Sequence, residues 1–108
     1  MYIIFQGKDL QWYWHLNGAN NHHVMAGGEG FTRREDAVRA ARDVKQYIAA
    51  TAEPFVQATD KLGRPYWHIL AANGQPVAVS GEYFSAFYVS VLTAITAKGI
   101  SDAAPVPA

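Results

Sequence analysis

The sequence contains no cysteine, no excess of either charge and no long apolar run. Without cysteine, the chain has no disulfide framework and no thiol chemistry. Nine lysines and arginines balance nine aspartates and glutamates, so the basic excess typical of proteins that contact many phosphates is absent. No apolar run reaches membrane-spanning length, and the start Met1–Phe5 is too short for the core of a signal peptide. These absences predict a cytoplasmic protein without a membrane partner, and they disfavour a nucleic-acid partner.

Motifs for a metal, a cofactor or catalysis are also missing. Zinc sites show three or four ligands at recognisable spacing, whereas His22 and His23 are adjacent and would point to opposite faces of a strand. The run Gly27–Gly30 precedes an expected helix but lacks the lysine and the spacing of a phosphate-binding loop. No Ser/His/Asp signature is present. We therefore expect no metal, no cofactor and no catalytic residue in a non-enzymatic protein; an enzyme with an unrecognised site is an alternative.

One stretch of the sequence occurs twice, at a constant offset of 53 residues and without a gap. Internal repeats of this kind indicate copies of one supersecondary unit. A unit of this size buries too little surface to be stable alone, so we expect a single domain made of repeat 1 (2–50) and repeat 2 (54–100), followed by a flexible tail (101–108). The identical pairs are Lys8/Lys61, Tyr13/Tyr66, Trp14/Trp67, His15/His68, Ala19/Ala72, Asn20/Asn73, Val24/Val77, Gly28/Gly81, Glu29/Glu82 and Phe31/Phe84.

The same residues carry a family resemblance. The pattern Trp-x-Leu-x-x-Ala-Asn, followed by Val-x-Ala-x-Gly-Glu-Gly-Phe and a helix, resembles the YegP-like family of tandem-repeat bacterial and archaeal proteins. The resemblance extends from about Tyr2 to Ile100, and the second copy departs from it at Tyr83, which follows Glu82 in place of glycine. It implies an α+β fold in which two β-β-β-α units share one sheet. It implies no biochemical activity, because none is established for the family.

Local patterns agree with this fold. Alternating, β-branched and aromatic residues predict strands, and helical spacing of apolar residues predicts helices. The expected strands are Tyr2–Gln6, Gln11–Asn17, His22–Gly27, Phe55–Thr59, Pro65–Ala71 and Pro76–Ser80. One helix is expected to begin at a capping box, Thr32 to Glu35; the other is expected to run from Ser85 to Lys98 with Gly99 just beyond it. The predicted fold class is α+β, with two tandem β-β-β-α repeats sharing one antiparallel sheet and helices packed on one face.

The repeated residues are expected to have structural roles. Trp14 and Trp67 share a strand face with apolar neighbours and are predicted to be wedges between sheet and helices. Asn20 and Asn73 are predicted turn residues because asparagine tolerates left-handed backbone, and Asn73-Gly74 favours a type I′ turn. Glu29 and Glu82 are predicted to anchor their loops or to face a helix N-terminal dipole.

The second helix lacks the charged face of the first. No charged residue occurs from Ser85 to Ala97, and a helix that is apolar all round is normally buried all round. Either this helix is central in the core, or its outer residues pair with another chain as a homodimer interface. The residues of this predicted interface are Tyr88, Val89, Leu92 and Ile95.

The sheet face opposite the tryptophans is the second candidate surface. Its predicted members are Tyr13, His15, Tyr66 and His68, which would repeat across the sheet as an aromatic, hydrogen-bonding surface. The favoured function is an interaction or ligand-binding module that acts as a homodimer, with an unknown protein or small molecule as a possible partner. Aromatic sheet faces also stack bases in RNA-binding proteins, so single-stranded nucleic-acid binding is the alternative.

Overall fold

The computed structural model describes residues 1–108, in which three strands followed by one helix occur twice along the chain. The strands are β1 (Tyr2–Gln6), β2 (Trp12–Asn17), β3 (His23–Gly27), β4 (Val56–Thr59), β5 (Pro65–Leu70) and β6 (Pro76–Ser80). The helices are α1 (Arg34–Ala50) and α2 (Phe87–Ala103), and a 3-10 helix, η1 (Ala19–Asn21), joins β2 to β3.

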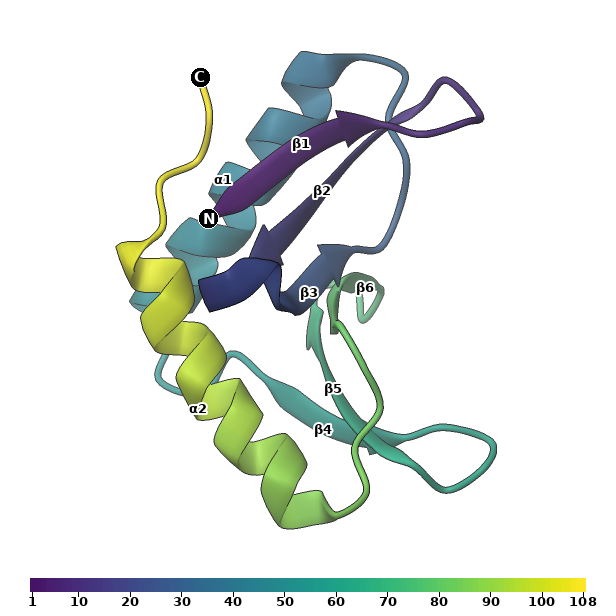
Figure 1. Ribbon diagram of the computed structural model, residues 1–108, viewed down its shortest axis with the longest axis vertical. Helices are drawn as coiled ribbons and strands as arrows, with labels where there is room; N and C mark the ends of the chain where they lie inside the picture. Colours follow the sequence, from purple (N-terminus) through teal and green to yellow (C-terminus); the bar gives the residue numbers. More distant parts are fainter.

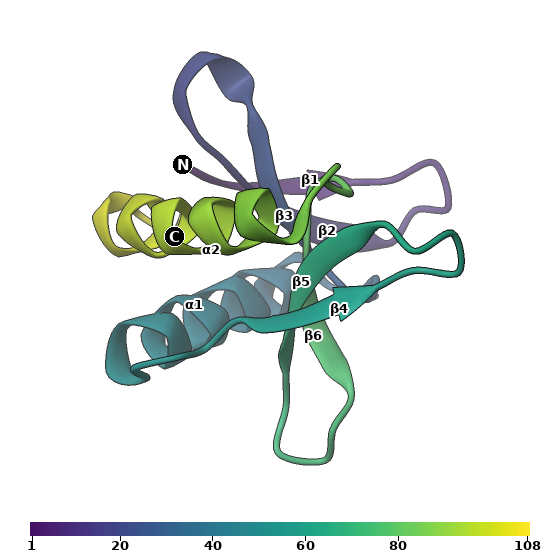
Figure 2. The ribbon, with the colours of Figure 1, turned by 90° about the horizontal axis from the view of Figure 1, so that it is seen from below.

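All six strands form one antiparallel sheet in the order β1-β2-β3-β6-β5-β4. The two helices lie beside each other against the same side of the sheet (Figure 1). α1 contacts β1 and β2, and α2 contacts β5. Seen from below, the two helices lie side by side on one side of the strands (Figure 2). The predicted α+β fold class with one antiparallel sheet is confirmed.

Strand pairing follows the same 53-residue offset as the sequence. β1 and β2 pair Ile3 with His15, and β4 and β5 pair their counterparts in the same register. At the centre of the sheet, Ala26 of β3 pairs with Val79 of β6, and these two residues are themselves 53 positions apart. The two halves therefore meet edge to edge at the β3–β6 contact. Their origin in a duplication stays a prediction.

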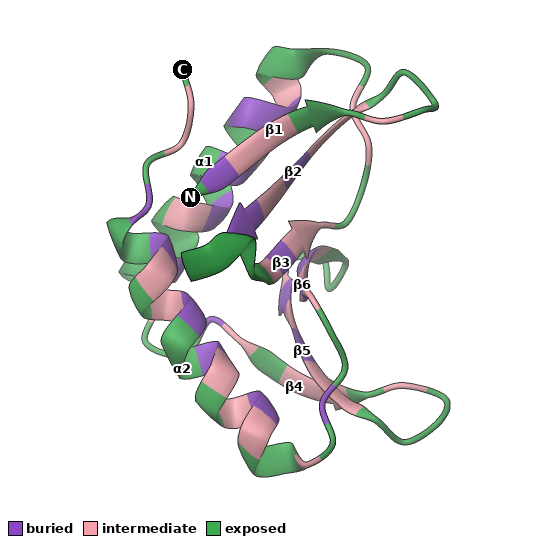
Figure 3. Ribbon diagram, viewed as in Figure 1, coloured by how far each residue is buried: buried purple, intermediate pink, exposed green.

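The core lies between the sheet and the two helices. Trp14 and Leu16 of β2, and Trp67 and Ile69 of β5, are buried on the strand face toward the helices (Figure 3). Both tryptophans belong to the same apolar cluster, in agreement with their expected place between sheet and helices. The other members of the cluster are Tyr2, Met25, Ala41, Val44, Ile48, Ala78, Phe84, Ala94, Ala97 and Ala104.

The predicted capping box at the start of α1 is wrong. Arg33 is the N-cap residue, and no side chain caps the helix. Phe31 and Trp12 form an isolated β-bridge with backbone hydrogen bonds of 2.6 and 2.8 Å, and the chain bends at Thr32 and Arg33 before the helix begins. The Arg33 side chain pairs instead with Asp36 in the first turn, with Nε 3.2 Å from Oδ2.

The predicted ends of α2 are also wrong. Ala86 is the N-cap residue in place of Ser85, and again no side chain caps the helix. At the other end, the helix continues through Gly99 to Ala103, although the sequence predicts an end at Lys98. Gly99 has no positive φ, so it does not terminate the helix.

Contacts with distant segments hold the last turn of α2. The buried hydroxyl of Ser101 lies 2.6 Å from the Tyr2 hydroxyl of β1. Lys45 of α1 donates from Nζ to the Ser101 carbonyl oxygen at 3.0 Å and also to that of Ala104, which satisfies carbonyls that the helix end leaves unpaired. The expected tail over 101–108 therefore begins only at Ala104, which is itself buried.

Two predicted turns have different outcomes. Asn20 has the expected left-handed backbone, with φ of 57°. Asn73-Gly74 does not form a type I′ turn, because only Gly74 has positive φ and that turn needs positive φ at both residues. The Gly74 amide donates to the Ala71 carbonyl at 2.9 Å, so the connection 71–75 is a longer loop than a two-residue hairpin.

Candidate functional site

The outer face of the sheet gathers the predicted Tyr-x-His pairs into two separate clusters. In the first, His15 lies 4.9 Å from Phe5 and 5.0 Å from His23, measured between ring centroids, and Phe5 also stacks on Tyr13 at 5.8 Å. We name these four residues the β2 cluster. Phe5 and His23 were not predicted as members; the antiparallel pairing of Phe5 with Tyr13 brings the first of them into place.

The second cluster is the counterpart on the other half of the sheet. Tyr66 contacts His68 at 5.6 Å and Tyr83 at 5.4 Å between ring centroids, both edge to face. The guanidinium carbon of Arg64 lies 4.4 Å from the centroid of the Tyr83 ring, a cation–π contact. We name these four residues the β5 cluster. Tyr83, which stands where the first copy has glycine, therefore enlarges this surface.

The two clusters repeat across the sheet but do not touch each other. His15 and His68 lie in one row across the sheet, but Ala26 and Val79 stand between them. Three strand spacings separate the two histidines, roughly 14 Å. Small and aliphatic residues thus divide the two aromatic clusters.

Carboxylates lie at the edge of both clusters. The Tyr13 hydroxyl donates to Asp9 Oδ2, and this hydrogen bond raises the pKa of Tyr13 and lowers the pKa of Asp9. Arg64 pairs with Asp60, with Nη2 2.6 Å from Oδ2. The carboxylates therefore engage the polar groups of both clusters and would repel a phosphate.

The surroundings of His15 should make the stability of the fold depend on pH. Burial, followed by repulsion from His23, lowers its pKa below the ordinary value of 6.5. Because the folded protein disfavours the charged imidazole, His15 supports folding above pH 6.5 and weakens it as pH falls below that value. We expect His15→Gln to unfold with a shallower loss of stability below pH 6.5 than the original protein, measured by urea denaturation.

The matching variant is His23→Gln, which should raise the pKa of His15 toward its usual range in an NMR titration of the imidazole. An unchanged His15 titration in that variant would remove the repulsion as a cause.

The predicted interface residues on α2 form an exposed apolar face. Tyr88, Leu92 and Ile95 are 68%, 58% and 65% exposed, while Val89 is half-buried and packs against the core. Phe87 at the helix start is also exposed. The alternative in which α1, the linker or the C-terminal residues cover this face is therefore wrong, because the side chains of Tyr88, Leu92 and Ile95 are exposed.

The two glutamates of the repeated stretch have different surroundings. Glu82 lies 3.9 Å from His22 Nε2. Glu29 makes no ion pair, and neither carboxylate caps a helix, because the caps of α1 and α2 have no side-chain hydrogen bond. The predicted role of these residues in anchoring their loops or facing a helix N-terminal dipole stays a prediction.

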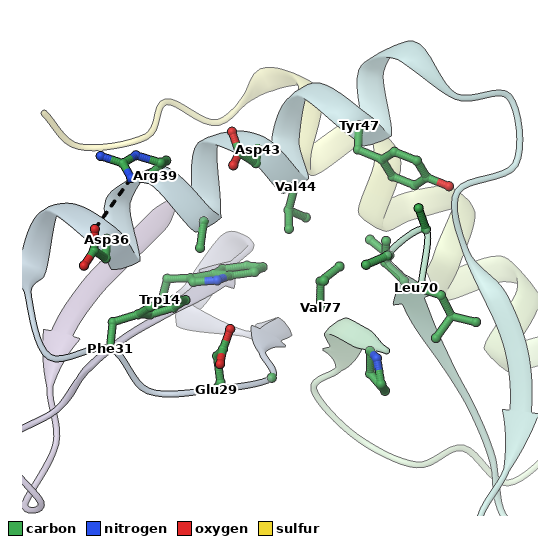
Figure 4. A pocket seen from close by; sticks show the side chains of 16 residues that line it. Trp14, Glu29, Phe31, Asp36, Arg39, Asp43, Val44, Tyr47, Leu70 and Val77 are labelled. Carbon is green, nitrogen blue, oxygen red and sulfur yellow. Dashed lines mark ion pairs between the residues drawn. The ribbon is translucent and has the colours of Figure 1, made fainter. Parts of the chain in front are cut away.

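A cavity that the sequence did not predict lies beside Glu29. It has a volume of about 760 Å³ and opens between α1 and the β5–β6 hairpin. Trp14, Phe31 and Val44 form an apolar wall, and Tyr47 lies at the far end (Figure 4). A local sequence pattern could not reveal this cavity, because its walls come from separate segments of the chain. The one signal in the sequence was that α1 and α2 carry different residues at equivalent positions.

Metal-binding clusters and membrane-spanning helices are absent from the structure. No group of three or more histidine, aspartate or glutamate side chains is placed to hold a metal ion. Neither helix is both long enough and apolar enough to cross a membrane.

Part of the chain matches a known protein family, and the whole fold is similar to two solved structures. Residues 8–53 match a family described as a domain of unknown function, DUF1508. The solution structure of the protein of unknown function yegP from E. coli has a TM-score of 0.80 and 18% identity, covering 94% of this chain and 85% of that one. A UPF0339 protein from Shewanella oneidensis has a TM-score of 0.77 and 17% identity, covering 93% and 82%. No curated protein matches the chain.

At these identities the two solved structures establish the shared fold and carry no function to this chain. They agree with the resemblance seen in the repeated residues. Residues 8–53 are thus a DUF1508 match, and the chain as a whole has the fold of the YegP-like proteins.

Proposed function

We propose that this protein is a non-enzymatic interaction module that acts as a homodimer through the exposed apolar face of α2. The observation that carries the proposal is the exposure of Tyr88, Leu92 and Ile95 on one side of a single helix. These residues are spaced four and three positions apart, which places them in one stripe. Exposed apolar stripes of this kind mark interaction sites.

A second copy is the partner that fits this stripe best. A two-fold interface pairs a surface with itself, so the surface must be self-complementary. An uncharged stripe meets this condition, since no like charges would face each other between Ser85 and Ala97. In an antiparallel arrangement Leu92 would lie near the two-fold axis, and Tyr88 of one copy would face Ile95 of the other.

The amount of apolar surface supports a dimer of moderate affinity. Full burial of a large apolar side chain is worth roughly 1.5–3 kcal/mol, and part of this gain offsets the lost freedom of two molecules. Gly99 follows the stripe one turn after Ile95, and a side chain there would meet no atom within 4 Å. The stripe therefore ends in open space, where a partner helix could approach closely.

Substitution of Leu92 with glutamate tests the dimer. We expect the original protein to have the mass of a dimer at tens of micromolar, the concentration range suited to a small interface, and Leu92→Glu to have the mass of a monomer. Light scattering after size exclusion measures both, and circular dichroism checks that the fold is kept.

The matched control is Leu62→Glu. Leu62 is also an exposed leucine, but it lies in the β4–β5 turn, away from α2. This variant should remain dimeric. A monomer mass for the original protein, or dissociation by both variants alike, would reject the proposed interface.

The outer sheet face is a second candidate surface for a partner or planar ligand. The β2 and β5 clusters offer exposed or half-buried rings from four strands and loops. Single-stranded nucleic acid is the weaker choice for this surface. Asp9 and Asp60 engage the polar groups of the clusters, whereas strand-binding surfaces combine stacking with uncompensated positive charge.

A further inference from the structure

The cavity beside α1 has a much smaller counterpart beside α2. Shifted by 53 positions, Trp14, Glu29 and Phe31 of the first become Trp67, Glu82 and Phe84 of the second. The first cavity measures about 760 Å³ and the second about 100 Å³. Ligand pockets measure roughly 300–1,000 Å³. Of these two clefts at equivalent positions in the fold, only the one beside α1 is therefore large enough to hold a small molecule.

An unpartnered hydrogen-bond donor distinguishes the large cavity. In the second half, Trp67 Nε1 donates to Thr93 Oγ1 at 3.2 Å. The equivalent of Thr93 on α1 is Ala40, which has no hydroxyl to accept from the indole, and Trp14 Nε1 has no hydrogen bond like that of Trp67. Trp14 is 98% buried, with 2% exposure, and lies in the cavity wall. Indole N–H groups inside proteins normally find an acceptor. Trp14 Nε1 is not among the fully enclosed unpaired atoms of the protein, so it is open to a molecule bound in the cavity.

Unpaired negative charge is the second distinguishing feature. Glu29 and Asp43 line the large cavity, and neither forms an ion pair. The one cation in the lining, Arg39, lies 3.7 Å from Asp36 and is thereby compensated. Glu29 extends toward the Trp14 ring from below, and Asp43 lies on α1 above it (Figure 4).

The small cleft lacks these features. Glu82 lies 3.9 Å from His22, and the position equivalent to Asp43 is Thr96. Where Tyr47 lines the large cavity, its counterpart Ile100 lines the small cleft and packs against the core. The second cleft is therefore too small for a ligand, and its glutamate lies near a histidine, which makes it a control within the same molecule.

We propose that the cavity beside α1 binds a small apolar molecule that carries a protonated amine. The apolar body packs against Trp14, Phe31 and Val44, and the ammonium group lies between the ring of Trp14 and the Glu29 carboxylate. An ammonium group is attracted both by carboxylates and by the face of an indole ring. An acceptor atom on the ligand would take the hydrogen bond of Trp14 Nε1. An anion is disfavoured, because Glu29 and Asp43 would repel it.

Three probes with one phenoxyethyl body test the charge preference: 2-phenoxyethylamine, 2-phenoxyethanol and 3-phenoxypropanoate. Their shared ether oxygen supplies the acceptor for Trp14 Nε1. The readout is the indole N–H signal of Trp14 in NMR spectra of the labelled protein, identified with Trp14→Phe. We expect a saturable shift of this signal, with the Trp67 signal unmoved. The amine should bind about fivefold tighter than the alcohol, the effect of one charge pair at close range in water, and the carboxylate should bind weakest.

Two pairs of variants locate the site. Glu29→Gln should weaken amine binding about fivefold and leave alcohol binding unchanged, whereas the matched change Glu82→Gln should alter neither. Ala40→Thr gives Trp14 the hydroxyl partner that Trp67 has, and it should reduce the shift for all three probes. Neither glutamine variant should change the oligomeric state measured by light scattering, so this test is independent of dimer formation.

Several outcomes would overturn the proposal. One is the absence of a saturable shift of the Trp14 signal with any probe. Another is equal binding of the amine, the alcohol and the carboxylate. A Trp67 signal that moves as far as that of Trp14, or equal effects of Glu29→Gln and Glu82→Gln, would place binding outside this cavity.

Discussion

Replacement of Trp67 with alanine is expected to lower the free energy of unfolding by about 3–5 kcal/mol, the usual cost of removing a large aromatic side chain from a packed core. Trp67 is 1% exposed and meets Phe55 edge to face, with ring centroids 4.8 Å apart. The alanine variant also loses the hydrogen bond from the indole nitrogen to Thr93. Native stabilities of 5–15 kcal/mol are typical, so the variant should be partly unfolded on moderate warming. Urea denaturation at 25 °C measures the loss.

The control for this prediction is the equivalent change Trp14→Ala. Trp14 is equally buried but borders the large cavity and has no hydrogen bond from its indole nitrogen. A side chain that already faces empty space has fewer contacts to lose. We therefore expect Trp14→Ala to cost about 1 kcal/mol less than Trp67→Ala, because the cost of truncation depends on the packing around the site. An equal or larger loss at Trp14 would mean that its environment is as densely packed.

Replacement of Tyr2 with phenylalanine is expected to destabilise the fold by about 1–3 kcal/mol, the cost of a buried polar group left without its partner. The Tyr2 hydroxyl lies 2.6 Å from Ser101 Oγ, and both residues are buried. This contact joins the first strand to the last turn of α2. Thermal or urea unfolding measures the loss, and α2 should fray beyond Gly99.

The double variant Tyr2→Phe with Ser101→Ala separates the lost hydrogen bond from lost packing. It should be more stable than Tyr2→Phe alone, because no hydroxyl is then left unpaired. A double variant that is simply the sum of two losses would contradict the coupling.

The burial of Tyr2 should also make the stability of the fold fall at alkaline pH. Burial raises its pKa from 10.0 to about 12. The folded state therefore favours the protonated phenol, and the stability that this supplies is complete below pH 10 and is lost as pH rises toward 12. The same denaturation series should show a flatter alkaline limb for Tyr2→Phe, which has no phenol to ionise.

The cavity and the α2 face are separate features of the molecule. Glu29 and Asp43 line the cavity on the side of α1, and the apolar stripe lies on α2. A ligand-binding module that dimerises could therefore bind one ligand in each copy without competition between the two surfaces.

The strands, the helices and the faces that they turn toward the core could be predicted from the residues alone. Alternation along β2 and β5 placed Trp14 and Trp67 in the core, and the six strands lie close to their predicted ranges. The uncharged character of α2 was also evident from the residues alone. These features are local: periodicity states which side of a strand or helix is apolar, so no knowledge of neighbours is needed.

What covers each apolar side depends on how the sheet and the helices pack together. This packing left Leu92 exposed on α2, extended that helix to meet Tyr2, and divided the aromatic sheet face into two clusters. It also opened a cavity where Ala40 stands and closed the equivalent cleft where Thr93 stands. Each of these outcomes depends on residues that are far apart in the chain and meet only when the sheet and both helices are packed, which local patterns do not encode.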